Sequence, residues 1–238
     1  MEEKETNKRH KVWAIVCGAV RQEFELYSIL SYLCEYRAKG LIEGIVLSTW
    51  VGEVDNVKNL REKLKFLDIH LVEIWPLSEE VSQYTNLNYT RQATQLLNGL
   101  RNIPDDVFVL KCRTDFCLNR IKLFKKVIEN PGILKLQSHG RFDTGLLYKI
   151  AVAEFGISNS FTLSDVVFLG HKLDIRKMLY FNFTQLTMQN NLWPDSLFFM
   201  SPFFGKFKFL EEFIYRFNYW LLGKSLQALW NSNDTEKR

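Results

Sequence analysis

Four short apolar runs, separated by amphipathic segments, occupy the first half of the sequence. Continuous runs of apolar and β-branched residues are typical of strands that are buried on both faces, as in a parallel sheet. The segments between them carry apolar residues at helical spacing. The apolar runs cover residues 12–20, 42–50, 69–75 and 107–113, and the helical segments cover 23–40, 56–67 and 86–102.

This alternation predicts an α/β fold, in which a mainly parallel central sheet is flanked by helices. No internal repeat, flexible linker or low-complexity segment divides the chain. We therefore expect a single domain over residues 12–205, between a flexible polar tail at 1–11 and an aromatic helical extension at 206–238. The less regular second half predicts helices at 121–130 and 171–181, and strands at 132–139 and 162–170.

Composition excludes several classes of protein. The net charge of +4 is too small to indicate a nucleic-acid-binding protein. The four cysteines lack the paired spacing of a zinc site or a disulfide framework, so we expect a reducing compartment. The amino-terminal residues lack the apolar core of a secretory signal, and no run of about 18 apolar residues occurs. These features predict a cytoplasmic protein that does not cross a membrane.

The fourth apolar run ends abruptly in charged residues, because residues 107–115 read VFVLKCRTD. Arg113 and Asp115 cannot be buried in the apolar layer of a sheet without a large desolvation cost. We therefore expect both side chains to face a polar pocket at the carboxyl end of this strand, where ligands bind in parallel α/β sheets. A structural ion pair at the rim of the sheet is the alternative.

Small and polar residues also end the first two apolar runs. Gly18 lies near the end of the first, and Ser48, Thr49 and Trp50 end the second. Because the carboxyl ends of parallel strands meet at one edge, we expect these residues to converge with Asp115. The convergence predicts a small-molecule site, in which Trp50 either stacks on a base or sugar or packs at the rim.

The helix expected at 86–102 supplies further candidates. Asn86 or Asn88 can cap its start, and we expect Arg91 and Gln92 in its first turn. Helix amino ends favour anions, and an arginine there adds a donor for a phosphate or a sugar hydroxyl. A solvated arginine is the alternative.

Four motifs occur in a fixed order along the chain: IVLSTW at 45–50, N-x-x-R-Q at 88–92, VLKCRTD at 109–115 and SDVVFLG at 164–170. Together they resemble the WavE lipopolysaccharide synthesis family, whose members look like GT-A glycosyltransferases. The match spans roughly residues 12–205, and KCRTD is its most specific part. The resemblance implies a GT-A-like fold, a nucleotide-sugar donor, and a glycan or glycolipid acceptor in lipopolysaccharide, lipooligosaccharide or capsule biosynthesis.

Carried over by position, the R-T-D sequence looks like the Asp-x-Asp motif of such enzymes, with Asp115 in the second aspartate place. The resemblance implies that Asp115 holds a divalent cation, Mn²⁺ or Mg²⁺, which bridges the donor diphosphate. Arg113 stands in the first aspartate place, where a guanidinium can itself bind phosphate oxygens, so metal dependence stays open. The expected nucleotide-sugar-binding residues are Gly18, Ser48, Thr49, Trp50, Asn88, Arg91, Gln92, Arg113 and Asp115.

Two later carboxylates are candidates for the catalytic base. The order of SDVVFLGHK and then PDSLFF looks like the GT-A order of an acceptor-side strand followed by an acidic residue that opens a helix. A base must lie within hydrogen-bond reach of the acceptor hydroxyl, and Asp195 fits that place best. Asp165 is the second candidate, or a ligand of a sugar hydroxyl. Asp195 alternatively serves only as a helix cap after proline. We expect His171, beside Gly170, to be a surface residue, with a contact to the diphosphate as the alternative.

The aromatic residues of 206–238 predict an amphipathic helix that either closes the core or lies on a membrane surface. We therefore expect a cytoplasmic protein, with a peripheral position at the inner membrane as an alternative. Two other classes of function stay open. Arg113 in the first aspartate place favours a nucleotide-sugar-binding scaffold without catalysis, and the aromatic carboxyl-terminal segment favours a membrane-associated interaction protein.

Overall fold

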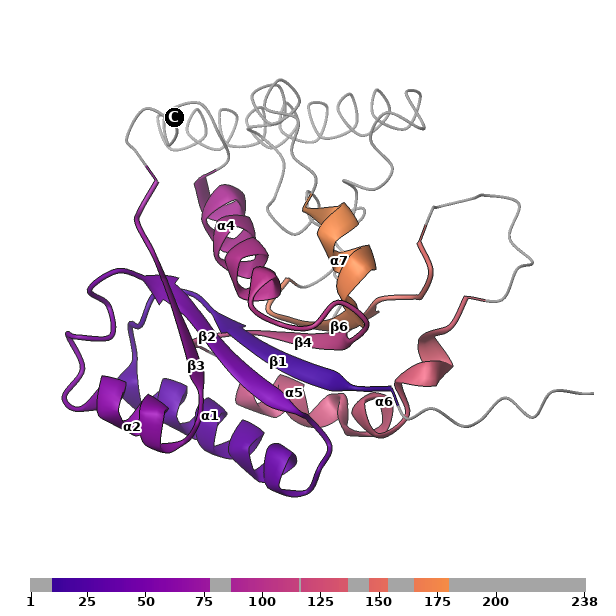
Figure 1. The fold of residues 1–238 in the computed structure, drawn as a ribbon, viewed down its shortest axis with the longest axis horizontal. Helices are drawn as coiled ribbons and strands as arrows, with labels where there is room; N and C mark the ends of the chain where they lie inside the picture. Colours follow the sequence, from indigo (N-terminus) through magenta and orange to yellow (C-terminus); the bar gives the residue numbers. More distant parts are fainter. Residues whose placement is uncertain (1–9, 78–86, 116, 137–145, 154–164, 180–238) are drawn as a thin grey trace, which may run out of the picture.

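The computed structural model describes residues 10–77, 87–115, 117–136, 146–153 and 165–179. Within these ranges a six-stranded sheet has the strand order β3-β2-β1-β4-β6-β5 (Figure 1). The strands are β1 (Val12–Cys17), β2 (Gly44–Trp50), β3 (His70–Ile74), β4 (Phe108–Arg113), β5 (Ala151–Val152) and β6 (Val167–His171). The helices are α1 (Glu23–Ala38), α2 (Leu60–Phe66), α4 (Leu87–Arg101), α5 (Leu118–Leu123), α6 (Lys125–Glu129) and α7 (Lys172–Met178).

The first four strands form the parallel part of the sheet. β1 lies at its centre and pairs in parallel with both β2 and β4, while β3 pairs in parallel with β2. Val16 of β1 lies level with Leu47 of β2 and Cys112 of β4. The carboxyl ends of these strands therefore meet at one edge of the sheet.

The remaining two strands make the sheet mixed. β6 runs antiparallel to β4, so that Val167 pairs with Cys112 and His171 pairs with Phe108. β5 is a short strand that pairs antiparallel with β6. Because β6 is reversed, its first residues lie beside the carboxyl end of β4, and its last residues lie beside the start of β4.

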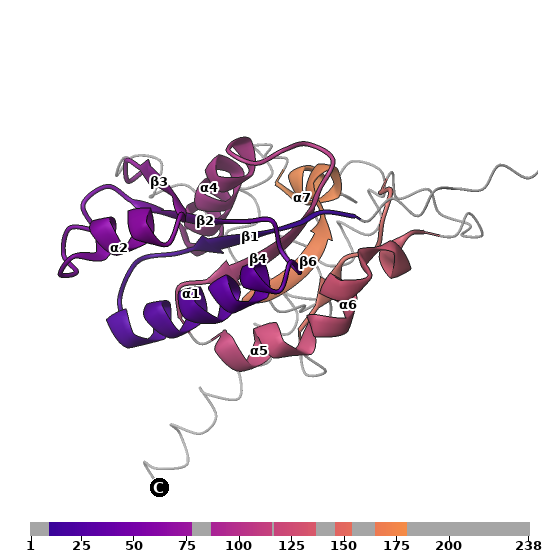
Figure 2. The same cartoon turned by 60° about the horizontal axis from the view of Figure 1, so that its bottom comes forward.

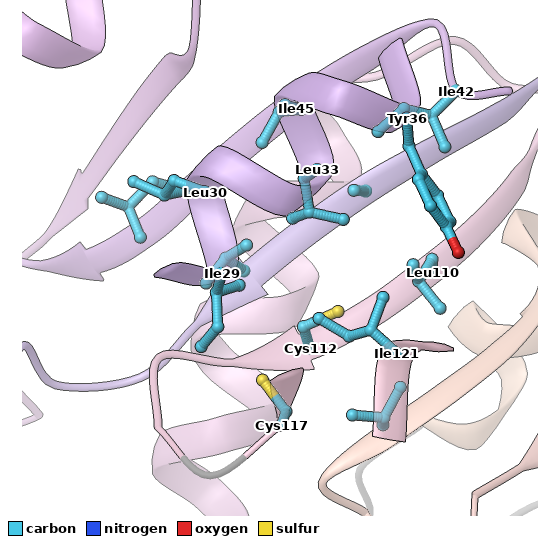
Figure 3. Packing of buried hydrophobic residues seen from close by; sticks show 14 of the residues in the cluster. Ile29, Leu30, Leu33, Tyr36, Ile42, Ile45, Leu110, Cys112, Cys117 and Ile121 are labelled. Atoms are coloured by element: carbon cyan, nitrogen blue, oxygen red, sulfur yellow. The ribbon is translucent and has the colours of Figure 1, made fainter. Parts of the chain in front are cut away.

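Two apolar layers hold the helices to the sheet. Side chains alternate along β1, so that Ala14 and Val16 belong to one layer and Ile15 and Cys17 to the other. Figure 1 shows α4 and α7 on one face, and Figure 2 turns α1, α5 and α6 on the opposite face into view. In the layer under α1, Figure 3 shows side chains of that helix, such as Leu33, gathered with Leu110 and Cys112 of β4.

The structure confirms the α/β class, the mainly parallel sheet and the helices on both faces. The strand expected at 132–139 is wrong in its described part, where Pro131–Leu134 form a 3₁₀-helix and Lys135 makes only an isolated bridge to Tyr148. Pro131 has no N–H for a strand ladder, and it suits the first turn of a helix. The helix expected at 121–130 is also different, because it is divided into α5 and α6 at Phe124.

Several expectations fall outside the described ranges. They are the polar tail as far as residue 9, the candidate base Asp195 and the aromatic extension at 206–238. Within the described ranges, the structure contains no helix that is both long enough and apolar enough to cross a membrane.

Candidate functional site

Three neighbouring strands end close to one another at one edge of the sheet. Cys17 of β1 lies level with Ser48 of β2 on one side and with Arg113 of β4 on the other. Gly18 follows Cys17 directly, and Asp115 lies two residues after Arg113. The parallel register therefore brings the expected residues of three strands to the same edge, which is where α/β sheets bind ligands.

The charged pair at the end of β4 is joined by two parallel hydrogen bonds. Arg113 Nε donates to Asp115 Oδ1 at 2.8 Å, and Arg113 Nη2 donates to Asp115 Oδ2 at 3.0 Å. The Asp115 side chain is 10% exposed, whereas 33% of the Arg113 side chain is exposed. This fork geometry fixes the plane of the guanidinium, so Asp115 orients Arg113 at the rim of the sheet.

Two carboxylates act on the guanidinium of Arg113. Burial works to lower the pKa of Arg113, but the hydrogen bonds and charge of Asp115 and the charge of Asp165 raise it, and the pKa lies above its ordinary value. The side chain therefore stays cationic. Asp165 lies two residues before Val167, which pairs with Cys112, so this second carboxylate belongs to the same end of β4 as Arg113.

Gly18 lets the turn after β1 come close to the end of β4. Its φ of +145° is a conformation that residues with a side chain rarely adopt, and a Cβ atom there would lie 2.6 Å from Thr114 Oγ1. Thr114 Oγ1 donates to Ala19 O at 2.7 Å, and Thr49 Oγ1 donates to Gly18 O at 2.8 Å. These bonds tie the turn after β1 to the strands on both sides, so the three strand ends form one structural unit.

A buried lysine lies beneath this edge. Lys111, in the middle of β4, is 0% exposed, and its Nζ donates to the backbone oxygen of Asp165 and, at 3.2 Å, to Gln92 Oε1 of α4. The ammonium also lies 5.4 Å from the centre of the Phe168 ring. Lys111 therefore connects the end of β4 to α4 and to the residues that lead into β6.

Asp165 is a second buried carboxylate at this end of the sheet, besides Asp115. The residue is 3% exposed, and its Oδ2 atom has no hydrogen-bond partner among the described residues. A buried carboxylate oxygen without a donor is unfavourable by itself, although the cations Lys111 and Arg113 lie nearby. Its free lone pairs give Asp165 the chemistry expected of a base or of an acceptor for a ligand hydroxyl.

The polar residues at the end of β2 take largely structural roles. Ser48 is fully buried and donates through Oγ to the backbone oxygen of Gln95 at 2.7 Å, while Thr49 is bonded to Gly18 as described. Trp50 is half-buried at the last position of the strand. Of these three residues, Trp50 has the surface that a stacked base or sugar requires.

The expectation for α4 is corrected in one respect. The helix already includes Leu87, so Arg91 and Gln92 lie beyond its first turn and cannot bind an anion through the amino end of the helix. Arg91 is exposed, whereas Gln92 reaches Lys111 beneath the site. The side chain of Asn88 lies outside the described residues.

His171 is buried, contrary to the expectation of a surface histidine. It is 3% exposed, packs at 5.3 Å between ring centres against Phe108, and lies with Nε2 3.4 Å from Asp106 Oδ1. Because β6 is antiparallel, His171 pairs with the first residue of β4 and lies at the opposite edge of the sheet from Arg113. The antiparallel direction of β6, which local sequence does not reveal, explains why His171 lies away from Arg113.

The donor set at this edge does not fit a divalent cation within the described part of the chain. Both oxygens of Asp115 already accept hydrogen bonds from Arg113. No group of three or more His, Cys, Asp or Glu side chains suitable for a metal lies together among the described residues. A cation on Asp115 would also lie next to a guanidinium of the same sign of charge.

Two pockets lie elsewhere on the described surface. One of about 480 Å³ lies where β2 and β3 begin, the opposite edge from Arg113. Its charged lining is largely paired, since Arg61 binds both Asp55 and Glu73, and Arg37 donates to backbone oxygens. A second pocket of about 530 Å³ lies between the starts of α1 and α5 and is lined by Cys117, two residues after Asp115. We place the site at the strand ends, because that edge combines an accessible cation with an unpartnered buried carboxylate oxygen.

Lys111 is the residue of this site that sequence reasoning missed. The signal was a lysine inside the otherwise apolar run VFVLKCR, at a position whose neighbours on both sides are buried. A lysine is almost never fully buried without a partner, so its position in the run indicates polar groups on adjacent elements.

Comparisons with models of protein families, with curated proteins and with solved structures find no match to this chain, so the geometry of the site is what argues for its function.

Proposed function

We propose that the chain is a glycosyltransferase that moves a sugar from a nucleotide-sugar donor to a glycan or glycolipid acceptor of the cell surface. The observation that carries this proposal is the meeting of Gly18, Arg113 and Asp115 at the carboxyl edge of a parallel sheet, beside the buried carboxylate of Asp165. The motif resemblance to WavE lipopolysaccharide synthesis proteins, and through them to GT-A enzymes, supports the same activity.

The chemistry required is charge stabilisation at one end of the donor and proton removal at the other. The leaving nucleoside diphosphate accumulates negative charge, which a fixed guanidinium stabilises. The acceptor hydroxyl needs a base within hydrogen-bond reach. In this proposal Arg113 acts on the diphosphate, and Asp165 or Asp195 acts on the acceptor. Asp165 lies near Arg113 in the described structure, and Asp195 lies outside it.

The proposal includes a place for the protein in the cell. In this proposal the transferase uses its nucleotide-sugar donor on the cytoplasmic side of the inner membrane. We therefore propose a cytoplasmic protein that associates peripherally with the inner membrane.

Turnover of the donor tests the proposal. Release of free nucleotide from UDP-, GDP- and CMP-sugars is measured for the wild-type protein and for Asp115→Ala, which releases Arg113 from its fixed orientation. We expect the variant to lose turnover while circular dichroism shows an intact fold. Asp105→Ala is the matched control, because Asp105 also forms an ion pair, at 2.8 Å with Lys172, but lies on the loop that enters β4. Unchanged turnover in Asp115→Ala rejects the role of the pair.

One observation favours a second candidate, a nucleotide-sugar-binding scaffold. The Arg113–Asp115 pair uses both oxygens of the carboxylate that the resemblance assigns to the divalent cation. A scaffold binds the donor and does not release free nucleotide. Equilibrium binding combined with absence of turnover, with and without Mn²⁺ and with acceptor present, distinguishes the scaffold from the transferase.

A further inference from the structure

The guanidinium of Arg113 has two edges, and the protein uses only one of them. The edge formed by Nε and Nη2 binds Asp115. The other edge, formed by Nη1 and the second hydrogen of Nη2, has no hydrogen-bond partner among the described residues. Arginine presents its N–H groups in a planar fork that matches two oxygens of a phosphate. The free edge is therefore an oriented fork at the rim of the sheet.

The surroundings keep this fork in place and keep it charged. Asp115 is 7% exposed and holds the guanidinium plane from one side, while the pKa of Arg113 lies above its ordinary value. One third of the Arg113 side chain is exposed, so the side chain is partly accessible to solvent. A fork that is fixed before binding loses little conformational entropy when the ligand arrives.

We propose that Arg113, oriented by Asp115, binds the diphosphate of the donor directly and without a divalent cation. This proposal rests on the proposed function, and it assigns to Asp115 a different role from that of a metal ligand. Asp115 is a positioning residue, which holds the guanidinium through Nε and Nη2 and leaves Nη1 for the phosphate oxygens. The same carboxylate cannot also offer two free oxygens to a metal.

The charges around the fork affect the strength of binding. Lys111 and Arg113 are balanced by Asp115 and Asp165, so the cluster as a whole is close to neutral. Binding of an anion therefore depends on the geometry of the fork rather than on a large positive field. A lysine at position 113, which lacks the planar fork, is therefore a poor substitute. Asparagine at position 115 keeps one acceptor for Arg113 and removes one negative charge, so this change should weaken anion binding without abolishing it.

Calorimetric titration with inorganic pyrophosphate tests the proposal, because pyrophosphate has the chemistry of the diphosphate and no sugar or base. The titration is done in EDTA and again in Mn²⁺. We expect the wild-type protein to bind pyrophosphate in EDTA, and Arg113→Gln to bind it roughly 10- to 100-fold more weakly, as the loss of a charge-assisted fork predicts. Arg113→Lys should lose most of the affinity as well, and Asp115→Asn should retain binding in EDTA.

The matched control is Arg101→Gln, which removes one cation from the last residue of α4, where Arg101 donates to Asn98. This variant should bind pyrophosphate like the wild type, and equal losses in Arg101→Gln and Arg113→Gln would overturn the assignment to Arg113. Binding that requires Mn²⁺ and is lost in Asp115→Asn also overturns this inference, but it leaves the proposed transferase intact. Absence of pyrophosphate binding in both EDTA and Mn²⁺ contradicts the inference and the proposed function together.

Discussion

Replacement of Gly18 by alanine tests whether the turn after β1 and the end of β4 form one unit. Two effects act at this position. An alanine must adopt a φ of +145°, and its Cβ would lie 2.6 Å from Thr114 Oγ1. Backbone strain of this kind costs roughly 1–3 kcal/mol. Thr114 can rotate away only by giving up its hydrogen bond to Ala19 O, which adds about 1 kcal/mol. We therefore expect Gly18→Ala to lower the free energy of unfolding by about 2–4 kcal/mol.

A double-mutant cycle separates the two effects. Thr114→Ala alone removes the hydrogen bond and should cost about 1–2 kcal/mol. In the double variant the steric clash has already been removed, so its loss should be smaller than the sum of the single losses by about 1 kcal/mol. The assay is equilibrium unfolding in urea, followed by circular dichroism. The reasoning is refuted if the two losses are additive, or if Gly18→Ala costs less than about 0.5 kcal/mol.

Three further predictions concern buried polar groups. Asp165→Asn should lower sugar transfer at least tenfold while circular dichroism shows an intact fold, because the amide cannot accept the acceptor's proton; full activity in a folded variant contradicts this. Asp174→Ala should cost about 3–5 kcal/mol in urea unfolding, since its oxygens accept from Leu147 N at 2.9 Å and Tyr148 N at 2.8 Å; a loss below about 1 kcal/mol refutes the role of these bonds. Burial raises the pKa of the Cys17 and Cys112 thiols above 9.0, so the unfolded protein releases these protons first and stability should fall as pH rises above 9.0. Urea unfolding between pH 8 and 10 measures how steeply the free energy of unfolding falls with pH. Cys17→Ala should make this fall less steep than in the wild type. An equal pH dependence in the two proteins would contradict the assignment to the Cys17 thiol.

The positions of the strands could be predicted because burial imposes a pattern on sequence. β1 and β4 are buried along nearly their whole length, so their residues are apolar apart from Lys111 and the terminal Arg113 of β4. Helix α1 could be predicted for a related reason, since its buried residues recur at helical spacing from Leu26 to Tyr36. The parallel order then brought Gly18 and Asp115 to one edge without any knowledge of side-chain contacts.

The direction of β6 could not be predicted, because a buried strand has the same apolar pattern whichever way it runs. That direction decides that Asp165, just before β6, lies near Arg113, whereas His171 at its end lies at the opposite edge. The partner of Arg113 was equally hidden. The sequence does not show whether an aspartate forms an ion pair with an arginine two residues earlier or is free to bind a ligand.

Burial of Lys111 shows a third limit of sequence reasoning. A lysine in an apolar run is compatible with an exposed rim position, and only the contacts with Gln92 and with the backbone of Asp165 show where its ammonium lies. Those contacts join elements far apart in the chain. Long-range partners of this kind depend on the packing of α4 and β6 against β4, which local patterns do not specify.

The most direct test of the central claim is thermal unfolding of the wild-type protein and of Arg113→Gln in the presence of UDP-, GDP- and CMP-sugars. Ligands that bind the native state raise its melting temperature by mass action. The account predicts that at least one of these donors raises the melting temperature of the wild type and leaves that of Arg113→Gln unchanged. Equal shifts in both proteins, or no shift in the wild type with any donor, would contradict a nucleotide-sugar site at the end of β4.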